Sequence, residues 1–255
     1  MLQIEQFTCL SDNFGVLVHD PETGRTACVD APDAAAISGA AKAKGWRLTD
    51  IMVTHHHADH TQGIAALKQE FGCRVTGPKG EADRIPGIDE AVGEGDVFTL
   101  GGYDFNVIET PGHTAGHIVY HSPKAGVLFA GDTLFSLGCG RLFERGAADM
   151  WQAMRKLRAL PGETLLYCGH EYTAANARFA VTVDPGNPAL KERAAEVEAL
   201  RGEGKPTLPV ALAGEFAANP FLRADDPAIR ALLGMEGASD EEVFAEIRKR
   251  KDNFR

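Results

Sequence analysis

The chain carries the stretch Thr-His-His-His-Ala-Asp-His at residues 54–60, and this stretch limits the fold more than any other part of the sequence. Four of the nine histidines fall within its last six residues. Residues 51–54 are apolar and partly β-branched, which predicts a buried strand, and residues 64–71 predict a helix. The cluster therefore follows the end of a strand, where α/β sheets commonly form their binding sites.

The spacing inside this cluster predicts two metal sites. Side chains alternate along an extended segment, so His55, His57 and Asp59 are expected to face the same side. His60 follows Asp59 directly and can reach the other side of that carboxylate. We therefore expect His55 and His57 to bind one ion, and Asp59 and His60 to bind a second ion close by. Imidazole and carboxylate suit zinc, iron or manganese, whereas His56 has the opposite parity and is not an expected ligand.

Three later strands are predicted to end in the same way, with a small residue and then a histidine or an aspartate. The strands at residues 103–108, 126–130 and 164–167 lead to His113, Asp132 and His170. Two mixed sheets can bring all these strand ends to one edge. Helices predicted at residues 33–45, 62–71 and 149–160 would cover the outer faces, which gives a layered α/β architecture.

The predicted elements before residue 173 are strands and helices, whereas those after it are helices alone. Helices are predicted at residues 172–183, 188–203, 226–233 and from 243 to about 251, and no strand is expected among them. Ser239 and Glu242 form the capping-box pattern that opens the last helix. We therefore divide the chain into a metal-binding catalytic domain at residues 1–173 and a small helical domain at residues 174–255.

The apolar content, the net charge and the cysteines of the chain disfavour several classes of function. An apolar fraction of 44% in 255 residues is enough for a core, and a net charge of -10 disfavours a nucleic-acid partner. There is no N-terminal basic-then-apolar segment, and no run approaches the roughly 18 apolar residues that span a membrane. The five scattered cysteines form no C-x-x-C motif. We therefore expect a cytoplasmic protein without a membrane or nucleic-acid partner, and nothing demands more than a monomer.

These motifs carry a family resemblance. Residues 54–60, Gly112-His113, Gly131-Asp132 and His170 resemble the motifs of metallo-β-lactamase-fold hydrolases. Longer strings at residues 111–117, 168–173, 219–223 and 248–252 are similar to those of the hydroxyacylglutathione hydrolases, the glyoxalase II family. The resemblance covers essentially the whole chain. It implies an α/β (α+β) fold, an αββα metallo-β-lactamase-like sandwich followed by a small all-helical C-terminal domain.

The resemblance also implies a centre of two divalent metal ions. Its first ion would be held by His55, His57 and His113, its second by Asp59, His60 and His170, with Asp132 bridging both. Zinc is the first expectation for the metal, with iron or manganese as the alternatives. Asp59, His60 and Asp132 are the residues expected to take part in catalysis.

Substrate binding is implied for five further residues in the second half of the chain. They are Arg141, Phe143, Tyr172, Arg248 and Lys251. Some family members carry Lys and Tyr where this chain has Arg141 and Phe143. Arg141 keeps the charge, but Phe143 lacks a hydroxyl, so one hydrogen bond worth about 1 kcal/mol is expected to be missing.

The implied activity is hydrolysis of S-(2-hydroxyacyl)glutathione, S-D-lactoylglutathione in particular, to glutathione and D-lactate, the second step of methylglyoxal detoxification. A metal-bridging hydroxide would be the nucleophile. A persulfide dioxygenase with one iron is the first alternative, and the full second-metal set disfavours it. A lactonase or β-lactamase-like hydrolase fits the helical C-terminal part less well. A non-catalytic metal-binding protein ranks last, because structural zinc sites are usually rich in cysteine.

Overall fold

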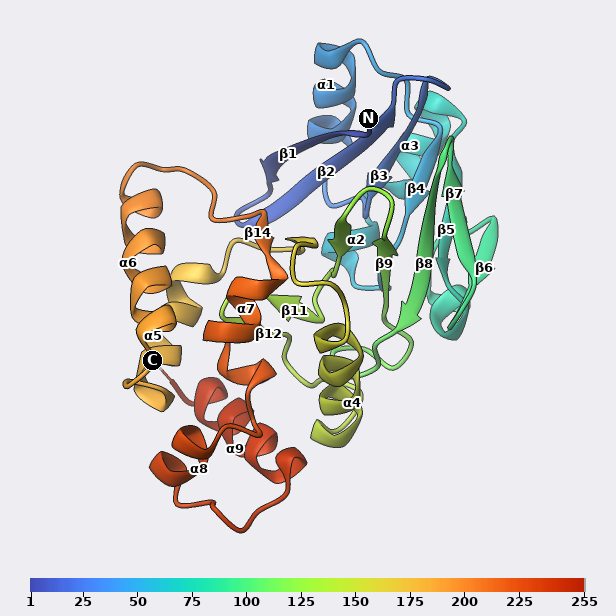
Figure 1. Cartoon of the computed structure of the whole chain (residues 1–255). Helices are drawn as coiled ribbons and strands as arrows, with labels where there is room; N and C mark the ends of the chain where they lie inside the picture. The colour runs from blue at the N-terminus through green and yellow to red at the C-terminus, as the bar shows by residue number, and fades with distance from the viewer. Residues whose placement is uncertain (255) are drawn as a thin grey trace. The chain divides into compact units, whose positions relative to one another are not determined.

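The computed structural model describes residues 1–254, which divide into two compact units (Figure 1). The first unit consists of Met1–Glu109 and Thr114–Gly131, and the second of Thr110–His113 and the chain from Asp132 onward. This division is not the one predicted from the sequence, and the predicted domain boundary between residues 173 and 174 stays a prediction. Each unit is described by itself below.

The first unit contains a mixed six-stranded sheet with the strand order β1-β2-β3-β4-β5-β6. Its strands are β1 (Gln3–Cys9), β2 (Asn13–Asp20), β3 (Arg25–Val29), β4 (Asp50–Met52), β5 (Arg74–Pro78) and β6 (Glu90–Val92). The first three strands form an antiparallel meander, and β3 to β6 pair in parallel. Residues 79–96 are rich in Gly, Asp and Glu, and their sequence predicts an irregular connection. That prediction was wrong for β6, which is too short to show a periodic pattern.

Helices α1 (Ala34–Lys44) and α3 (Ile64–Phe71) pack their apolar residues against this sheet. Ile37 of α1 and Ile64 and Leu67 of α3 join sheet residues such as Ile51 in one buried cluster. Helix α1 begins where the Asp33 carboxylate accepts hydrogen bonds from two backbone N–H groups, and it ends at Gly45 with φ of 70°. The short helices α2 (Ala58–Thr61) and η1 (Lys79–Arg84) follow β4 and β5.

A second set of strands in the same unit is antiparallel, with the order β10-β9-β8-β7. Its strands are β7 (Val97–Leu100), β8 (Tyr103–Glu109), β9 (Ile118–Ser122) and β10 (Val127–Phe129). Tyr120 of β9 is fully buried, and its hydroxyl donates to the carbonyl of Val53, 3.0 Å away, beyond the end of β4. The two sets of strands therefore pack face to face, with α1 and α3 on the outer side of the first.

The second unit is mainly helical, with one short hairpin, β11–β12, and one short antiparallel pair, β13–β14. Its elements are β11 (Leu134–Phe135), β12 (Gly138–Cys139), α4 (Ala147–Arg158), β13 (Leu165–Tyr167), α5 (Thr173–Val183), α6 (Pro188–Gly202), β14 (Val210–Ala211), α7 (Leu212–Ala218), η2 (Pro220–Leu222), α8 (Pro227–Leu233) and α9 (Asp240–Asp252). The predicted helices correspond to α5, α6, α8 and α9. The expectation of no strand after residue 173 was wrong, because Val210 and Ala211 pair with β13.

Side chains of the helices hold the β11–β12 hairpin. The Asn219 side-chain amide donates to the carbonyls of Phe135 and Gly138, both at 3.1 Å, and the Asn176 amide donates to the Ser136 carbonyl at 3.1 Å. The buried Glu215 carboxylate accepts from the Ser136 hydroxyl at 2.6 Å and from the Leu137 N–H at 2.8 Å. Leu137 has a φ of 57°, so the turn of the hairpin depends on these contacts.

The last helix is capped as predicted, but it begins at Asp240 rather than at Val243. Ser239 Oγ accepts from the Glu242 N–H at 3.3 Å, and the Glu242 carboxylate accepts from the Ser239 N–H at 2.8 Å. Within residues 1–254, none of the helices combines the length and the apolar character needed to cross a bilayer.

Candidate metal centre and substrate-binding residues

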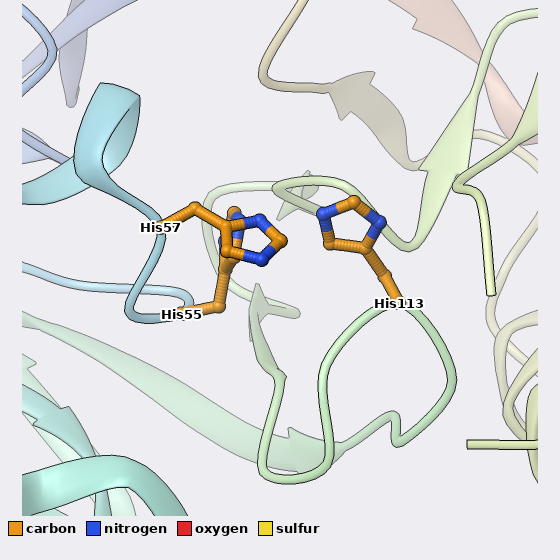
Figure 2. Close-up of side chains that lie close together, drawn as sticks. All are labelled: His55, His57 and His113. Atoms are coloured by element: carbon orange, nitrogen blue, oxygen red, sulfur yellow. The ribbon is translucent and has the colours of Figure 1, made fainter. Parts of the chain in front are cut away.

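His55 and His57 lie on the segment that joins β4 to α2 (Figure 2). The Nε2 atom of His55 is 3.1 Å from Nδ1 of His57, and the two ring centroids are 4.7 Å apart. Two imidazole nitrogens that converge in this way can share one divalent ion. Figure 2 also draws His113, which lies on the loop that follows β8.

Asp59 and His60 lie on helix α2, so the extended turn expected through residue 60 was wrong in that part. These two residues are neighbours in the chain, and His60 Nε2 lies 3.7 Å from Asp59 Oδ2. The ring centroids of His55 and His60 are 4.1 Å apart. The histidine predicted for one ion therefore adjoins the histidine predicted for the other, as two-metal hydrolytic sites require.

Asp30 orients this cluster, and the sequence interpretation missed it. Its carboxylate is 2.8 Å from His60 Nδ1 and also accepts from the N–H and the hydroxyl of Thr54, at 2.7 and 2.8 Å. A proton on Nδ1 bound to Asp30 leaves His60 Nε2 as the metal-binding atom. Asp30 follows strand β3 directly, so the strand-then-aspartate pattern that identified Asp132 could have found it as well.

The second unit contributes a cluster of two histidines and one aspartate. Asp132 Oδ2 lies 3.5 Å from Nε2 of His113 and 3.4 Å from Nε2 of His170. The other ring nitrogen of His113, Nδ1, is 3.0 Å from the Arg141 carbonyl, which holds a proton there and leaves Nε2 as the nitrogen that can bind a metal ion. All three side chains are buried. The set has the donors and the spacing that suit a divalent cation.

Nearby cysteines are poor nucleophiles. Burial raises the pKa of the Cys139 thiol to about 11 and raises that of the Cys168 thiol well above its usual range. Both thiols are therefore protonated at neutral pH, and a protonated thiol is neither a strong nucleophile nor a metal ligand. The chemistry of this region thus depends on histidine and carboxylate.

Exposed aromatic rings border the cluster of the second unit. Tyr172 stacks on His170 with a centroid separation of 4.7 Å and an interplanar angle of 3°. The Phe143 ring lies 5.2 Å from that of His113 and is 61% exposed. Both rings offer apolar surface to a ligand that approaches the histidines, and Phe143 does so without a hydroxyl.

The predicted cations on α9 have structural partners. Arg248 is buried and donates to the Cys139 carbonyl at 2.9 Å and to the Asp252 carboxylate at 2.8 Å. Lys251 donates to the Ala175 carbonyl at 2.9 Å. Burial, followed by the nearby charges of Arg248, Arg178 and Arg141, lowers the pKa of Lys251 to about 8. The binding roles of these cations stay predictions, but positive charge is concentrated here, as an anionic ligand would require.

Layered sheets with histidines and aspartates at their strand ends define a metal-dependent enzyme of the metallo-β-lactamase type. Residues 28–170 match the family described as the metallo-beta-lactamase superfamily, and residues 171–254 match the family described as hydroxyacylglutathione hydrolase C-terminus. The chain belongs to the hydroxyacylglutathione hydrolase family. The predicted fold class is thereby confirmed, and the family and the His/Asp clusters together support the binding of divalent metal ions.

Individual relatives agree with this membership. A protein from Rhizobium johnstonii named hydroxyacylglutathione hydrolase is 62% identical over 253 residues, covering 99% of each chain. A protein of the same name from Mesorhizobium japonicum is 61% identical over the same length and coverage. The solved structure of ETHE1 from Myxococcus xanthus covers 97% of this chain and 90% of its own, with a TM-score of 0.69. Its sequence identity is 24%, so this likeness concerns the fold alone.

Proposed function

We propose that the protein hydrolyses the thioester of S-(2-hydroxyacyl)glutathiones, S-D-lactoylglutathione in particular, and releases glutathione and a 2-hydroxy acid such as D-lactate. The name shared by its full-length relatives supports this activity. The observation that carries it within the molecule is Asp132, whose Oδ2 lies between the Nε2 atoms of His113 and His170. Exposed aromatic rings and cations on the same unit complete a surface suited to an anionic thioester.

The metal centre is proposed to hold two divalent ions, zinc first, with iron or manganese as the alternatives. The proposed ligands of the first ion are His55, His57 and His113, those of the second are Asp59, His60 and His170, and Asp132 would contact both. Seven imidazole and carboxylate donors match the preferences of these metals.

Bound ions of this kind lower the pKa of water, so that hydroxide is present at neutral pH, and they polarise a carbonyl oxygen. The protein orients their ligands: Asp30 and the Arg141 carbonyl hold the Nδ1 protons of His60 and His113. Oxygen from water bonds to the thioester carbon, the carbon–sulfur bond breaks, and glutathione leaves as its thiol after the sulfur takes a proton. Tyr172 and the cations near Lys251 are proposed to bind the glutathione part.

We further propose that the protein is a cytoplasmic monomer that acts on a small molecule. All five cysteines are buried thiols, which fits a reducing compartment.

The direct test measures hydrolysis of S-D-lactoylglutathione by purified protein whose metal content has been determined. Nitrocefin hydrolysis and oxygen uptake with glutathione persulfide serve as parallel assays. We expect rapid thioester loss with about two metal ions per chain and little activity in the other two assays. Oxygen consumption without thioester loss, with one iron per chain, would show that the proposed reaction is wrong.

The Lys251 environment predicts a pH dependence. Since its pKa is lowered to about 8, this lysine is charged at pH 7 and mostly neutral at pH 9. If the charged form binds a glutathione carboxylate, kcat/KM should fall by up to about tenfold between these two pH values. The Lys251→Arg variant should lose this dependence, because arginine stays protonated. Lys249→Arg, a change at a mostly exposed side chain, is the control. A Lys251→Arg profile equal to that of the wild type would contradict the assignment.

A further inference from the structure

Glu81 on η1 is a fully buried carboxylate in the first unit, and both of its oxygens are in use. Oε2 accepts from the backbone N–H of His56 at 2.8 Å and lies 2.7 Å from the His56 Nδ1 atom. Oε1 accepts from the backbone N–H of Gly116 at 2.8 Å. Glu81 therefore joins the segment that carries His55 and His57 to the loop that precedes β9.

The surrounding backbone is shaped to fit this carboxylate. A Cβ atom on Gly116 would lie 2.8 Å from the Cγ of Glu81 and 2.9 Å from the carbonyl carbon of Gly80. A Cβ on Gly80 would lie 3.1 Å from the Cα of Gly116. Side chains at these two positions would push the segments apart, so the two glycines let the η1 backbone and the β9 loop meet at Glu81.

Each of the two groups that Glu81 holds is next in the chain to His55 or to a residue that stacks on it. His56 follows His55 in the chain, so a fixed His56 N–H fixes the peptide plane between the two residues. Gly116 precedes His117, whose fully buried ring stacks on His55 with a centroid separation of 4.8 Å. The carboxylate therefore constrains both the backbone that carries His55 and the ring that packs against it.

A purely structural role would not require a charge at this position. Burial of a carboxylate is costly unless hydrogen bonds compensate for the lost water, and well-packed apolar residues often replace buried charges without loss of stability. The charge here is surrounded by donors that all come from residues next to the His55–His57 pair or next to its stacking partner. That arrangement resembles the outer carboxylates that orient metal-binding histidines, although it acts through backbone N–H groups.

We propose that Glu81 is a positioning residue for the His55–His57 pair, and that it acts mainly through the backbone N–H groups of His56 and Gly116. The buried carboxylate holds the two imidazoles in the geometry that binds a divalent ion. This inference rests on the proposed metal-dependent function. It also gives His56 a role in the site without making it a ligand.

The test compares the Zn²⁺ affinity of four variants in the full-length protein by competition with a chromophoric chelator. Glu81→Ala is expected to lower the affinity by about 10- to 100-fold, which is the usual effect of losing an orienting partner of a metal ligand. Glu81→Gln keeps the shape but presents an amide N–H to one of the donors, so its affinity should also fall, by about 10-fold. His56→Ala keeps the backbone N–H contact and should stay within about threefold of the wild type.

Glu90→Ala is the matched control, because Glu90 lies on the neighbouring strand β6 and contacts Thr76 and Arg74. Its Zn²⁺ affinity should equal that of the wild type. Thermal unfolding of each metal-free variant shows which proteins are folded. If Glu81→Ala does not fold, the isosteric Glu81→Gln variant decides the question.

Wild-type Zn²⁺ affinity in a folded Glu81→Gln variant would overturn the proposal. A His56→Ala variant that loses as much affinity as Glu81→Gln would also overturn it, because the imidazole would then matter rather than the backbone contact. A wild-type protein that binds Zn²⁺ but does not hydrolyse the thioester would refute the proposed substrate. In that case the affinity comparison would still decide the role of Glu81.

Discussion

Replacement of Asp132 by alanine is expected to lower kcat/KM for S-D-lactoylglutathione by at least about a thousandfold, which corresponds to about 4 kcal/mol of transition-state stabilisation. The carboxylate lies 3.4 and 3.5 Å from the Nε2 atoms of two histidines, so its loss leaves both without their common partner. We expect a loss of bound metal as well, since no other residue is proposed to contact both ions. The measurements are steady-state kinetics and metal content per chain.

Two further variants make this result specific. His55→Ala removes a proposed ligand from the other cluster and should show a loss of similar size. His19→Ala removes an imidazole that contacts Thr26 and stacks on Trp46, and it should keep activity and metal. Full thioesterase activity in folded Asp132→Ala and His55→Ala proteins, freed of contaminating enzymes, would show that the metal mechanism is wrong.

The largest effect on stability is expected from Glu215→Ala, with a loss of about 3 kcal/mol in the free energy of unfolding. The Glu215 carboxylate is 1% exposed and accepts from the Ser136 hydroxyl, the Leu137 N–H and the Asn219 side-chain amide, the last at 3.0 Å. Its removal leaves the Ser136 hydroxyl and the Leu137 N–H without this acceptor, whereas the Asn219 amide keeps the carbonyls of Phe135 and Gly138. Each buried donor without an acceptor costs about 1–3 kcal/mol. Relaxation of the cavity and entry of water offset part of that sum.

Urea unfolding followed by circular dichroism measures this change. Glu198→Ala on the exposed side of α6 is the control and should change the free energy of unfolding by less than about 0.5 kcal/mol. A loss below about 1 kcal/mol in Glu215→Ala would mean that the β11–β12 hairpin does not depend on this carboxylate.

Local patterns in the sequence were enough to predict much of the fold. The capping-box pattern of Ser239 and Glu242 predicted the N-terminal cap of α9. Apolar runs that end in glycine and then histidine or aspartate predicted the strands that lead to candidate ligands. These signals are local because caps and strand ends depend on neighbouring residues. Six strands were missed: β6, β7, β9, β11, β12 and β14. Four of them have only two or three residues, which carry no period, so they form only through pairing with partner strands.

The sequence analysis also did not predict the two buried carboxylates that contact residues far away in the sequence. Asp30 is 30 residues from His60, and Glu81 is 35 residues from Gly116, so no spacing rule connects either pair. Their role becomes visible only when the fold brings a buried charge to a particular N–H or ring nitrogen. The candidate ligands could therefore be predicted from the sequence, and the strand-then-aspartate pattern could have added Asp30. The contact of Asp30 with His60 and the role of Glu81 could not be predicted.

The contacts of the β11–β12 hairpin have a consequence for protein engineering. Asn176, Asn219 and Arg248 from the helical part donate to carbonyls of this hairpin, which belongs to the stretch of chain before residue 173. A chimera that exchanged the two halves of related proteins at residue 173 would separate each donor from the acceptor with which it evolved. Recombination between family members should therefore tolerate crossovers before residue 132 better than crossovers within the segment from 134 to 173.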